Sequence, residues 1–323
     1  MRKNIYAFCL AVFASVFILS CSGNELYDDN SMTDLELGNS NLDIPDQFKI
    51  IGEKHNEGLD AAFAAIKSHY KQVKTRSGDT LTRLSKDEYL LIAEQGLKKF
   101  CAENVDNYSD EFYGHIRAEM MPKTRAQGET MSPKVYVFVE KMKELLADEP
   151  DSPDQLVKGL NEINKAAAVE LSGTELEAVY AGTSTCYSSY IYWNENRMKW
   201  FMILNNPDLA SQLDDEDLNH FAFKNGKLVP PTQTRSWWDD AWSSVGEGWD
   251  STKDYVSDWW SNGGGKEVVS SDAGGAVAGA IGGAIGGSSL AGVGAGPGAI
   301  AGGISGGTYS SIDQAIQQWI LRS

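Results

Sequence analysis

Basic residues are scarce in this chain, and their scarcity excludes a class of partner. The 323 residues include 28 Lys and Arg against 45 Asp and Glu, so the formal net charge is -17. A charge of this sign repels the phosphates of nucleic acid and of anionic lipid headgroups. We therefore expect no nucleic-acid partner, and any contact with a membrane must be hydrophobic or covalent.

Motifs of the common hydrolases and nucleotide-binding proteins are also absent. The chain has no HExxH, no paired CxxC, no GxSxG and no P-loop. Its four histidines are His55, His69, His115 and His220. His55 lies near Glu53, Glu57 and Asp60 in sequence, and a metal site of carboxylates and histidine could be assembled in space, so a metal-dependent hydrolase remains an alternative. The main expectation is a non-enzyme without catalytic residues, metal or cofactor.

Alternation of apolar and polar residues, the signal of half-buried strands, is missing as well. Apolar residues instead follow three- and four-residue spacing, as from Phe48 to Ile66. Helix starts are predicted at Ser85, Ser132, Ser152 and Thr174, where a capping box or a Ser-Pro pair occurs. We predict an all-α fold whose domain at residues 45–223 is a bundle of five or six helices.

A change of composition marks a second region after the bundle. Residues 224–236 contain glycine, two prolines and polar side chains, which predicts a linker between the bundle and a domain at residues 237–323. Six of the nine tryptophans lie between Trp237 and Trp260, and four of them keep to helical spacing, at positions 238, 242, 249 and 260. An amphipathic helix at a bilayer interface is one interpretation, and packing on the rest of the protein is the other. The interfacial interpretation assigns membrane contact to Trp238, Trp242, Trp249, Trp259 and Trp260.

Charge is wholly absent from Ala273 to Ile312, where glycine recurs at four-residue spacing. This spacing places glycines on one stripe of a helix, where a second backbone can approach closely. We predict a hairpin of two helices, and a helix of residues 273–290 would be about 27 Å long, barely enough to span a bilayer. Membrane insertion or assembly with further copies, a tight soluble hairpin and a flexible segment are left open. The predicted helix-packing residues are Gly275, Gly279, Gly283, Gly287, Gly298, Gly302 and Gly306.

The N-terminus has the pattern of a secretory signal. Arg2 and Lys3 precede an apolar run from Ile5 to Leu19, and the run ends in the tetrapeptide Ile-Leu-Ser-Cys at Cys21. This tetrapeptide resembles the lipobox of bacterial lipoproteins, which implies a signal peptide at residues 1–21 and lipidation of Cys21. Polar residues 22–44 would form a flexible tether. In such lipoproteins an Asp after the cysteine is the signal for retention in the inner membrane, so the resemblance, with Ser22 at that position, implies the outer membrane of a Gram-negative bacterium. The periplasmic or surface-facing orientation is left open.

Cysteine is rare, and two of the four residues belong to the signal segment. Cys9 lies in the apolar run and Cys21 in the lipobox, so Cys101 and Cys186 remain in an oxidising compartment. One disulfide between them and two separately buried thiols are both compatible with the sequence.

Two further resemblances concern the body of the chain. The signatures IGxxHNxxLD at Ile51–Asp60 and SSYxYW at Ser188–Trp193 are similar to those of a group of uncharacterised bacterial envelope proteins, which implies no activity. The uncharged hairpin resembles glycine-zipper segments, including those of small pore-forming bacteriocins. That resemblance implies a membrane-permeabilising effector, although the net negative charge departs from the usual bacteriocin pattern.

Together these patterns predict a helical bundle, a Trp-rich amphipathic helix and a glycine-zipper hairpin in one lipid-anchored envelope protein. The hairpin would serve helix packing, oligomerisation or membrane association. The expected partners are the membrane, through the lipid and through the hairpin, and a second copy of the chain. A bacteriocin-like or toxin-like effector is the alternative.

Overall fold

A computed structural model describes residues 41–77, 81–106, 108–120, 131–150, 152–207, 211, 223–224, 227–228, 255–256, 258–260, 262–287 and 295–321. Within these ranges the fold is all-α, as predicted, and two strands of two residues each accompany the helices. The predicted signal peptide, Cys21 and residues 22–40 of the tether lie outside them.

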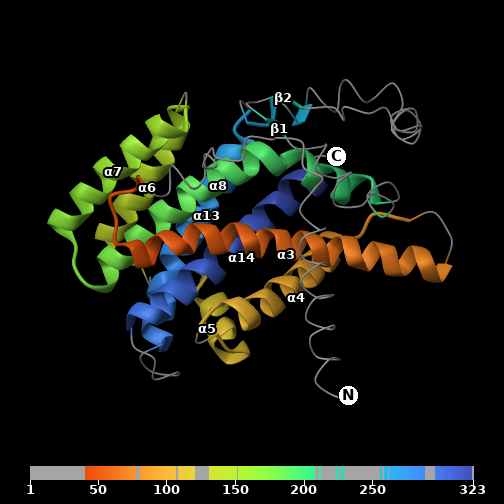
Figure 1. The fold of residues 1–323 in the computed structure, drawn as a ribbon, viewed down its shortest axis with the longest axis horizontal. Coiled ribbons are helices and arrows are strands. Elements are labelled where there is room, and N and C mark those ends of the chain that lie inside the picture. The colour runs from red at the N-terminus through yellow and green to blue at the C-terminus, as the bar shows by residue number, and fades with distance from the viewer. Residues whose placement is uncertain are drawn as a thin grey trace, which may run out of the picture.

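Among the described residues, six helices form the first part of the bundle, and the hairpin supplies two more. The first six are α3 (Asp46–Ser77), α4 (Lys86–Asn104), α5 (Asp110–Met120), α6 (Pro133–Ala147), α7 (Pro153–Glu170) and α8 (Thr174–Asn205). The hairpin helices are α13 (Gly264–Gly286) and α14 (Ala295–Leu321). In Figure 1, α3 runs along the length of the molecule, with α6 and α7 at one end and α4 and α5 below it.

Helix starts follow the predicted caps in three of four cases. Ser85 forms a capping box with Glu88 at the start of α4, and Ser132 and Ser152 cap α6 and α7 ahead of a proline. A cap side chain of this kind accepts from backbone N–H groups that have no partner within the helix. The start of α8 differs, because Gly173 occupies the N-cap position at φ 55° and no side chain caps the helix.

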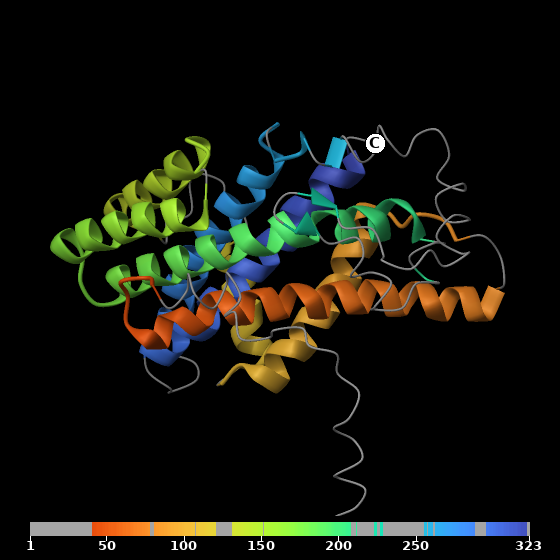
Figure 2. The same ribbon diagram turned by 45° about the horizontal axis from the view of Figure 1, so that its top comes forward.

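The hairpin lies inside the bundle (Figures 1 and 2). Helix α13 packs on α14, α8, α5 and α6, while α14 also packs on α3, α8 and α4. One continuous hydrophobic core includes Ile51 and Trp193 from the predicted first domain and Val277 and Ile316 from the predicted second. The two sequence segments therefore share a core, although the linker was expected to separate two domains.

A short hairpin occupies the beginning of the predicted linker. Strand β1 (Phe223–Lys224) pairs antiparallel with β2 (Lys227–Leu228), and Phe223 lies opposite Leu228. The intervening sequence is Asn-Gly, which is the preferred pair for a two-residue hairpin turn. Residues 229–254 lie outside the described ranges, and so does most of the predicted Trp-rich helix.

Glycines 263–265 form the start of α13, with Gly263 at the N-cap position. Gly263 has a left-handed backbone at φ 91°, and the helix begins at the next residue. A Cβ at Gly264 would lie 2.1 Å from Trp259 Nε1, and one at Gly265 would lie 2.0 Å from Trp260 Cε3. The helix start is thus covered by two indole rings that leave no space for larger residues.

Candidate functional site

The two signature segments, which lie far apart in the sequence, face each other where α3 crosses α8. The backbone N–H of Gly52 donates to Ser184 Oγ at 3.1 Å, and Asn56 Nδ2 donates to the carbonyl of Ser188 at 3.1 Å. A Cβ at Gly52 would lie only 2.2 Å from Ser188 Oγ. The spacing of small and polar residues in these segments therefore has a packing function, because it allows two helix backbones to approach.

A second set of contacts extends this interface toward the end of the signatures. The hydroxyl of Tyr192 donates to Asp60 Oδ1 at 2.9 Å and accepts from the indole N–H of Trp200 at 3.0 Å. Burial, together with the nearby Asp60 carboxylate, raises the pKa of Tyr192 well above its ordinary value. The phenol is therefore neutral at physiological pH and serves as a hydrogen-bond relay.

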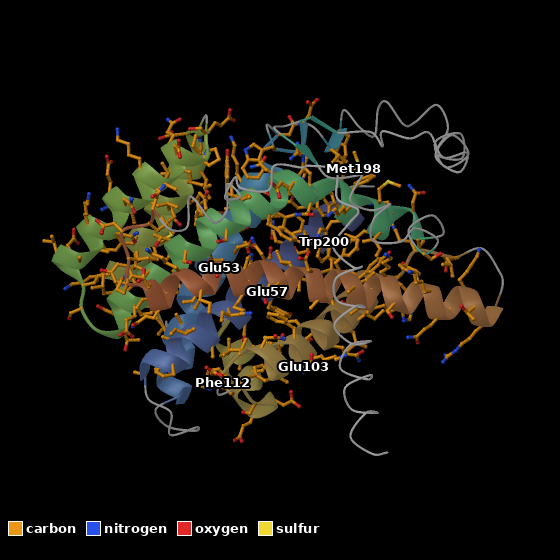
Figure 3. All side chains as sticks on the ribbon, in the orientation of Figure 1. Glu53, Glu57, Glu103, Phe112, Met198 and Trp200 are labelled. Atoms are coloured by element: carbon orange, nitrogen blue, oxygen red, sulfur yellow. The ribbon has the colours of Figure 1, made fainter. Side chains whose placement is uncertain are left out.

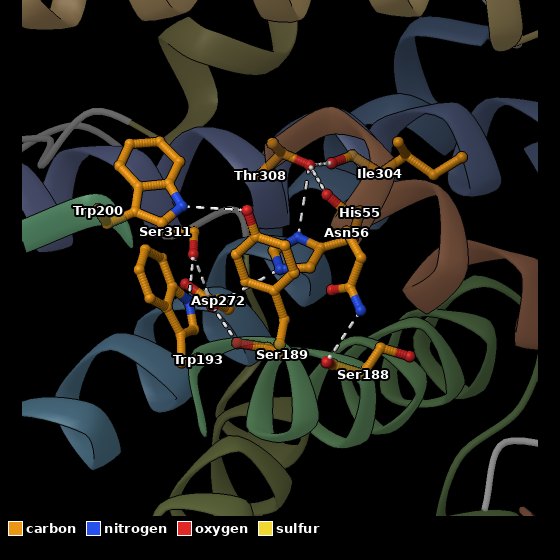
Figure 4. A network of polar contacts seen from close by, with 11 residues as sticks. His55, Asn56, Ser188, Ser189, Trp193, Trp200, Asp272, Ile304, Thr308 and Ser311 are labelled. Carbon is orange, nitrogen blue, oxygen red and sulfur yellow. Dashed lines mark hydrogen bonds and ion pairs between the residues drawn. The ribbon is translucent and has the colours of Figure 1, made fainter. Parts of the chain in front are cut away.

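Four helices, α3, α8, α13 and α14, meet around the carboxylate of Asp272, which belongs to α13 (Figure 4). Its Oδ2 accepts hydrogen bonds from Ser189 Oγ, from Ser311 Oγ at 2.8 Å and from Trp193 Nε1 at 3.3 Å. Trp193 Nε1 also lies 3.0 Å from Ser311 Oγ. The Asp272 side chain is fully buried, at 0% exposure. A buried carboxylate requires such compensation, because an isolated charge in the protein interior is strongly unfavourable.

His55, on α3, completes the junction. Its Nε2 lies 3.6 Å from Asp272 Oδ2, and its Nδ1 lies 3.4 Å from the hydroxyl of Thr308. Thr308 in turn donates to the carbonyl of Ile304 at 2.8 Å. Within the described part of the chain, His55 Nε2 and Asp272 Oδ1 have no hydrogen-bond partner. We call His55, Ser189, Trp193, Asp272, Thr308 and Ser311 the Asp272 cluster.

The Asp272 cluster is a buried polar network that connects helices. Its residues come from α3, α8, α13 and α14, and all six are buried. The carboxylate lies between the serine hydroxyl and the imidazole, whereas a nucleophilic triad needs the imidazole beside the hydroxyl. The arrangement therefore connects four helices and does not activate Ser189.

The predicted helix-packing glycines meet one another across α13 and α14. A Cβ at Gly279 would lie 2.2 Å from the carbonyl oxygen of Gly302, and one at Gly283 would lie 2.1 Å from that of Gly298. A Cβ at Gly275 would lie 2.7 Å from the carbonyl oxygen of Gly306. Gly287 lies at the same seam, with its Cα 3.1 Å from the position of a Cβ at Gly298. These pairs make the hairpin antiparallel and bring its two backbones into contact.

The predicted interfacial tryptophans divide into two sets. Trp259 is 3% exposed, packs against the ring of Trp319 and donates from Nε1 to Gln318 Oε1 at 2.7 Å. Trp260 packs edge-on against Tyr190, with ring centroids 5.0 Å apart. For these two residues the structure agrees with packing on the protein and not with lipid contact. Trp238, Trp242 and Trp249 lie outside the described residues.

The disulfide that the sequence allowed is not formed, and the alternative of two buried thiols describes the structure. Cys101 is free and lies 3.7 Å from Ser305 Oγ, while Cys186 is free and buried on α8. The two thiols are held apart because α4 packs mainly on α3 and α14. Burial raises the pKa of Cys101 to about 12, and burial with the nearby Asp272 carboxylate also raises the pKa of Cys186.

The metal site that the sequence allowed near His55 is not assembled. His55 is buried, whereas Glu53 and Glu57, labelled on α3 in Figure 3, are exposed on another face of the helix. Glu57 instead forms an ion pair with Lys54 at 2.7 Å. Among the described residues, no group of three or more His, Cys, Asp or Glu side chains could hold a metal ion.

The sequence alone does not identify Asp272 as a residue of the site. It directly precedes the uncharged segment, and it resembles the other acidic residues that border that segment. The available signal is its position, because a carboxylate one residue before a long apolar stretch belongs to the same helix and shares its burial.

Among the described residues, α13 is the helix whose length and composition would suffice to cross a membrane. Its most apolar window has a mean hydropathy of 1.3, and 72% of that window is buried inside the fold. A core helix of a soluble protein has the same properties, so this finding alone does not assign a membrane span. A comparison of the chain with protein-family models, with curated proteins and with solved structures finds no match.

Proposed function

We propose that this chain is a lipid-anchored, non-enzymatic protein of the Gram-negative outer membrane, in which the glycine hairpin organises the helical domain. The lipobox at Cys21 supports the anchor. The observation that carries the role of the hairpin is the contact between Gly279 on α13 and Gly302 on α14, at the centre of one hydrophobic core. A hairpin enclosed by five other helices serves packing, and the lipid supplies membrane attachment.

Lipidation at Cys21 is tested by labelling cells with a fatty-acid probe. We expect the wild-type chain to be labelled and processed, with processing blocked by globomycin, and we expect neither label nor processing for Cys21→Ser. Cys9→Ser is the matched control, because Cys9 lies in the apolar run and not in the lipobox. Equal labelling of Cys21→Ser and the wild type would refute the anchor.

Assembly through the glycine stripes would require α13 and α14 to separate, because the stripes already contact each other within one chain. We therefore expect the chain of residues 22–323 to be a monomer by light scattering at micromolar concentration. A stable dimer that dissociates in Gly279→Ala would contradict this expectation and would favour the oligomerisation alternative.

A membrane-permeabilising effector is the second candidate, and one observation favours it. The hairpin has no charge from Ala273 to Ile312, and this uncharged stretch is flanked by Asp272 and Asp313. A hairpin of this kind could enter a bilayer by its uncharged turn without burying a charge. Release of an entrapped dye from vesicles by residues 22–323 tests this candidate, and the absence of leakage in every lipid mixture would exclude it.

A further inference from the structure

The C-terminal part of α3 gathers positive charge in a chain that is acidic as a whole. From Ala61 to Gly78 the sequence has no Asp or Glu, although the formal net charge of the chain is -17. The basic residues of this segment are Lys67, Lys71, Lys74 and Arg76. In both Figure 1 and Figure 2 this part of α3 extends past the ends of α4 and α8. The fold therefore presents a basic segment on a projecting helix.

A shallow hollow lies on one face of this segment. Its volume is about 260 Å³, and its lining residues are Ser68, Lys71, Gln72, Thr75 and Arg76. These positions recur at three- and four-residue spacing, so they share one side of the helix. All five residues are exposed, and two of them carry a positive charge. Neither a carboxylate nor an apolar side chain is among the described residues that line the hollow.

The two cations of the hollow are not neutralised by the protein. Within the described part of the chain, neither the ammonium of Lys71 nor the guanidinium of Arg76 forms an ion pair. The nearby carboxylate of α4, Glu88, accepts instead from Ser85 at the helix cap, at 2.7 Å. Two free cations beside hydroxyl and amide groups offer the interactions that a phosphate group accepts.

The opposite side of the segment fixes the hollow on the fold. Ile66 and Tyr70 are buried there, at 0% and 2% exposure. The hydroxyl of Tyr70 lies 2.5 Å from that of Tyr89 on α4 and accepts from the backbone N–H of Leu84 at 3.3 Å. The helix that carries the hollow is therefore held in place before an anion binds, and only side chains remain to be ordered.

An anion on a bilayer suits this hollow better than an anion in solution. Each Lys or Arg near an anionic membrane raises the affinity by only about fivefold, which is too little for two cations to hold a free phosphate. A protein anchored through Cys21 meets lipid headgroups at a high effective concentration, so weak contacts suffice.

The anchor is long enough for this contact. Helix α3 begins at Asp46, and the hollow lies roughly 33–45 Å further along its axis. The segment from Cys21 to Asn41 has about 20 residues and spans at most about 70 Å when fully extended. The hollow therefore lies within reach of the bilayer that holds the lipid.

The net charge of the chain does not forbid the contact. At physiological ionic strength, salt screens exposed charges over a distance of about 8 Å. Acidic residues elsewhere on the fold therefore act only weakly on an anion in the hollow. The repulsion expected between an acidic chain and anionic lipid applies to the surface as a whole, and this face of α3 is a local exception.

We propose that the hollow lined by Lys71 and Arg76 binds anionic lipid headgroups and thereby orients the anchored domain on its bilayer. The inference rests on the lipid anchor of the proposed function for the proximity of that bilayer. It adds the surface that faces the membrane and the chemistry that this surface recognises, which is a phosphate group beside two cations.

Flotation of residues 22–323 with vesicles tests the hollow without the lipid anchor. The anionic vesicles contain equal amounts of dioleoyl phosphatidylglycerol and dioleoyl phosphatidylcholine, and vesicles of phosphatidylcholine alone are the neutral reference. At about 0.1 M salt we expect the wild type to partition about tenfold to thirtyfold more strongly into the anionic vesicles. The double variant Lys71→Gln, Arg76→Gln should lose this preference.

Two further double variants separate the hollow from net charge and from side-chain shape. Lys134→Gln with Lys158→Gln removes the same charge from exposed lysines of α6 and α7, at the other end of the molecule, and should keep the wild-type preference. Lys71→Arg with Arg76→Lys keeps both cations and should keep it too. Far-UV circular dichroism and urea denaturation check that all variants are folded as the wild type is.

The outcomes distinguish the hollow from its alternatives. Absence of any preference of the wild type for anionic vesicles overturns the proposal. An equal loss in both glutamine double variants also overturns it, because net charge would then govern binding. If the wild type binds inorganic phosphate in calorimetry but does not bind the vesicles, the hollow serves a soluble anion and the lipid assignment is wrong. None of these results tests the anchor, which is judged by Cys21→Ser alone.

Discussion

Substitution of Gly279 by alanine should separate the two hairpin helices. The added Cβ would lie 2.2 Å from the carbonyl oxygen of Gly302 and 3.0 Å from the Cα of Gly306. Both neighbours are backbone atoms, so no side chain can rotate away. To reach the 3.4 Å of an ordinary contact, the carbonyl oxygen must move away by about 1.2 Å, and the whole glycine seam must open with it.

The expected effect on the free energy of unfolding combines two opposing contributions. Overpacking of a rigid interior costs about 1–3 kcal/mol. Alanine in place of glycine within a helix contributes about 0.5–1 kcal/mol in the other direction. We therefore expect Gly279→Ala to be destabilised by about 1–2 kcal/mol.

Gly274→Ala is the matched control on the same helix. Its Cβ would meet only Val139 Cγ1, at the ordinary distance of 3.7 Å, so the gain in helix propensity should appear alone. Because both variants gain the same helix propensity, they should differ by the overpacking cost alone, about 1–3 kcal/mol. Urea denaturation of residues 22–323, followed by circular dichroism and tryptophan fluorescence, measures this difference. Equal unfolding midpoints for the two alanine variants at unchanged slope would refute the close contact between the backbones.

Three other predictions concern the thiols, a helix cap and a buried phenol. Burial raises the pKa of Cys101 to about 12 and also raises that of Cys186, so both thiols should be protonated at neutral pH. We expect them to react with a thiol reagent only after denaturation. Fast reaction of the folded chain would contradict their burial. Ser85→Ala removes the cap that Glu88 completes, and should lower the free energy of unfolding by about 0.5–2 kcal/mol in urea denaturation, whereas an unchanged midpoint would mean that the cap is dispensable. Tyr192→Phe leaves a buried indole N–H without its acceptor and should cost about 1–3 kcal/mol in the same assay, and a variant as stable as the wild type would argue against the hydrogen bond.

Local sequence patterns predicted the helices well, because helix starts and faces depend on neighbouring residues. The caps at Ser85, Ser132 and Ser152 each satisfy backbone groups within one turn. The start of α8 escaped because a glycine with a positive φ can begin a helix without a capping side chain. Gly264 and Gly265 are helical although glycine is a poor helix former, because Trp259 and Trp260 pack on them, and local propensity does not record such a contact.

The candidate site was predictable only in part. The signature around His55 and the one around Ser189 were recognised as separate segments, and their contact across α3 and α8 was not. The structure adds Asp272, which meets both. Similarly, the sequence permitted Cys101 and Cys186 to bond or to remain apart, and the arrangement of α4 between α3 and α14 separates them.

By itself, the sequence determined that the chain is helical and that glycines 275, 279 and 283 share one stripe of an uncharged helix, because four-residue spacing is a geometric property of any α-helix. Only the tertiary structure decided what that stripe contacts. It meets α14 of the same chain, inside a core built from both sequence segments, and the Asp272 cluster connects α13 to α3, α8 and α14. The surface against which a stripe packs depends on the shape and burial of the whole chain. The periodicity within one segment therefore cannot predict it.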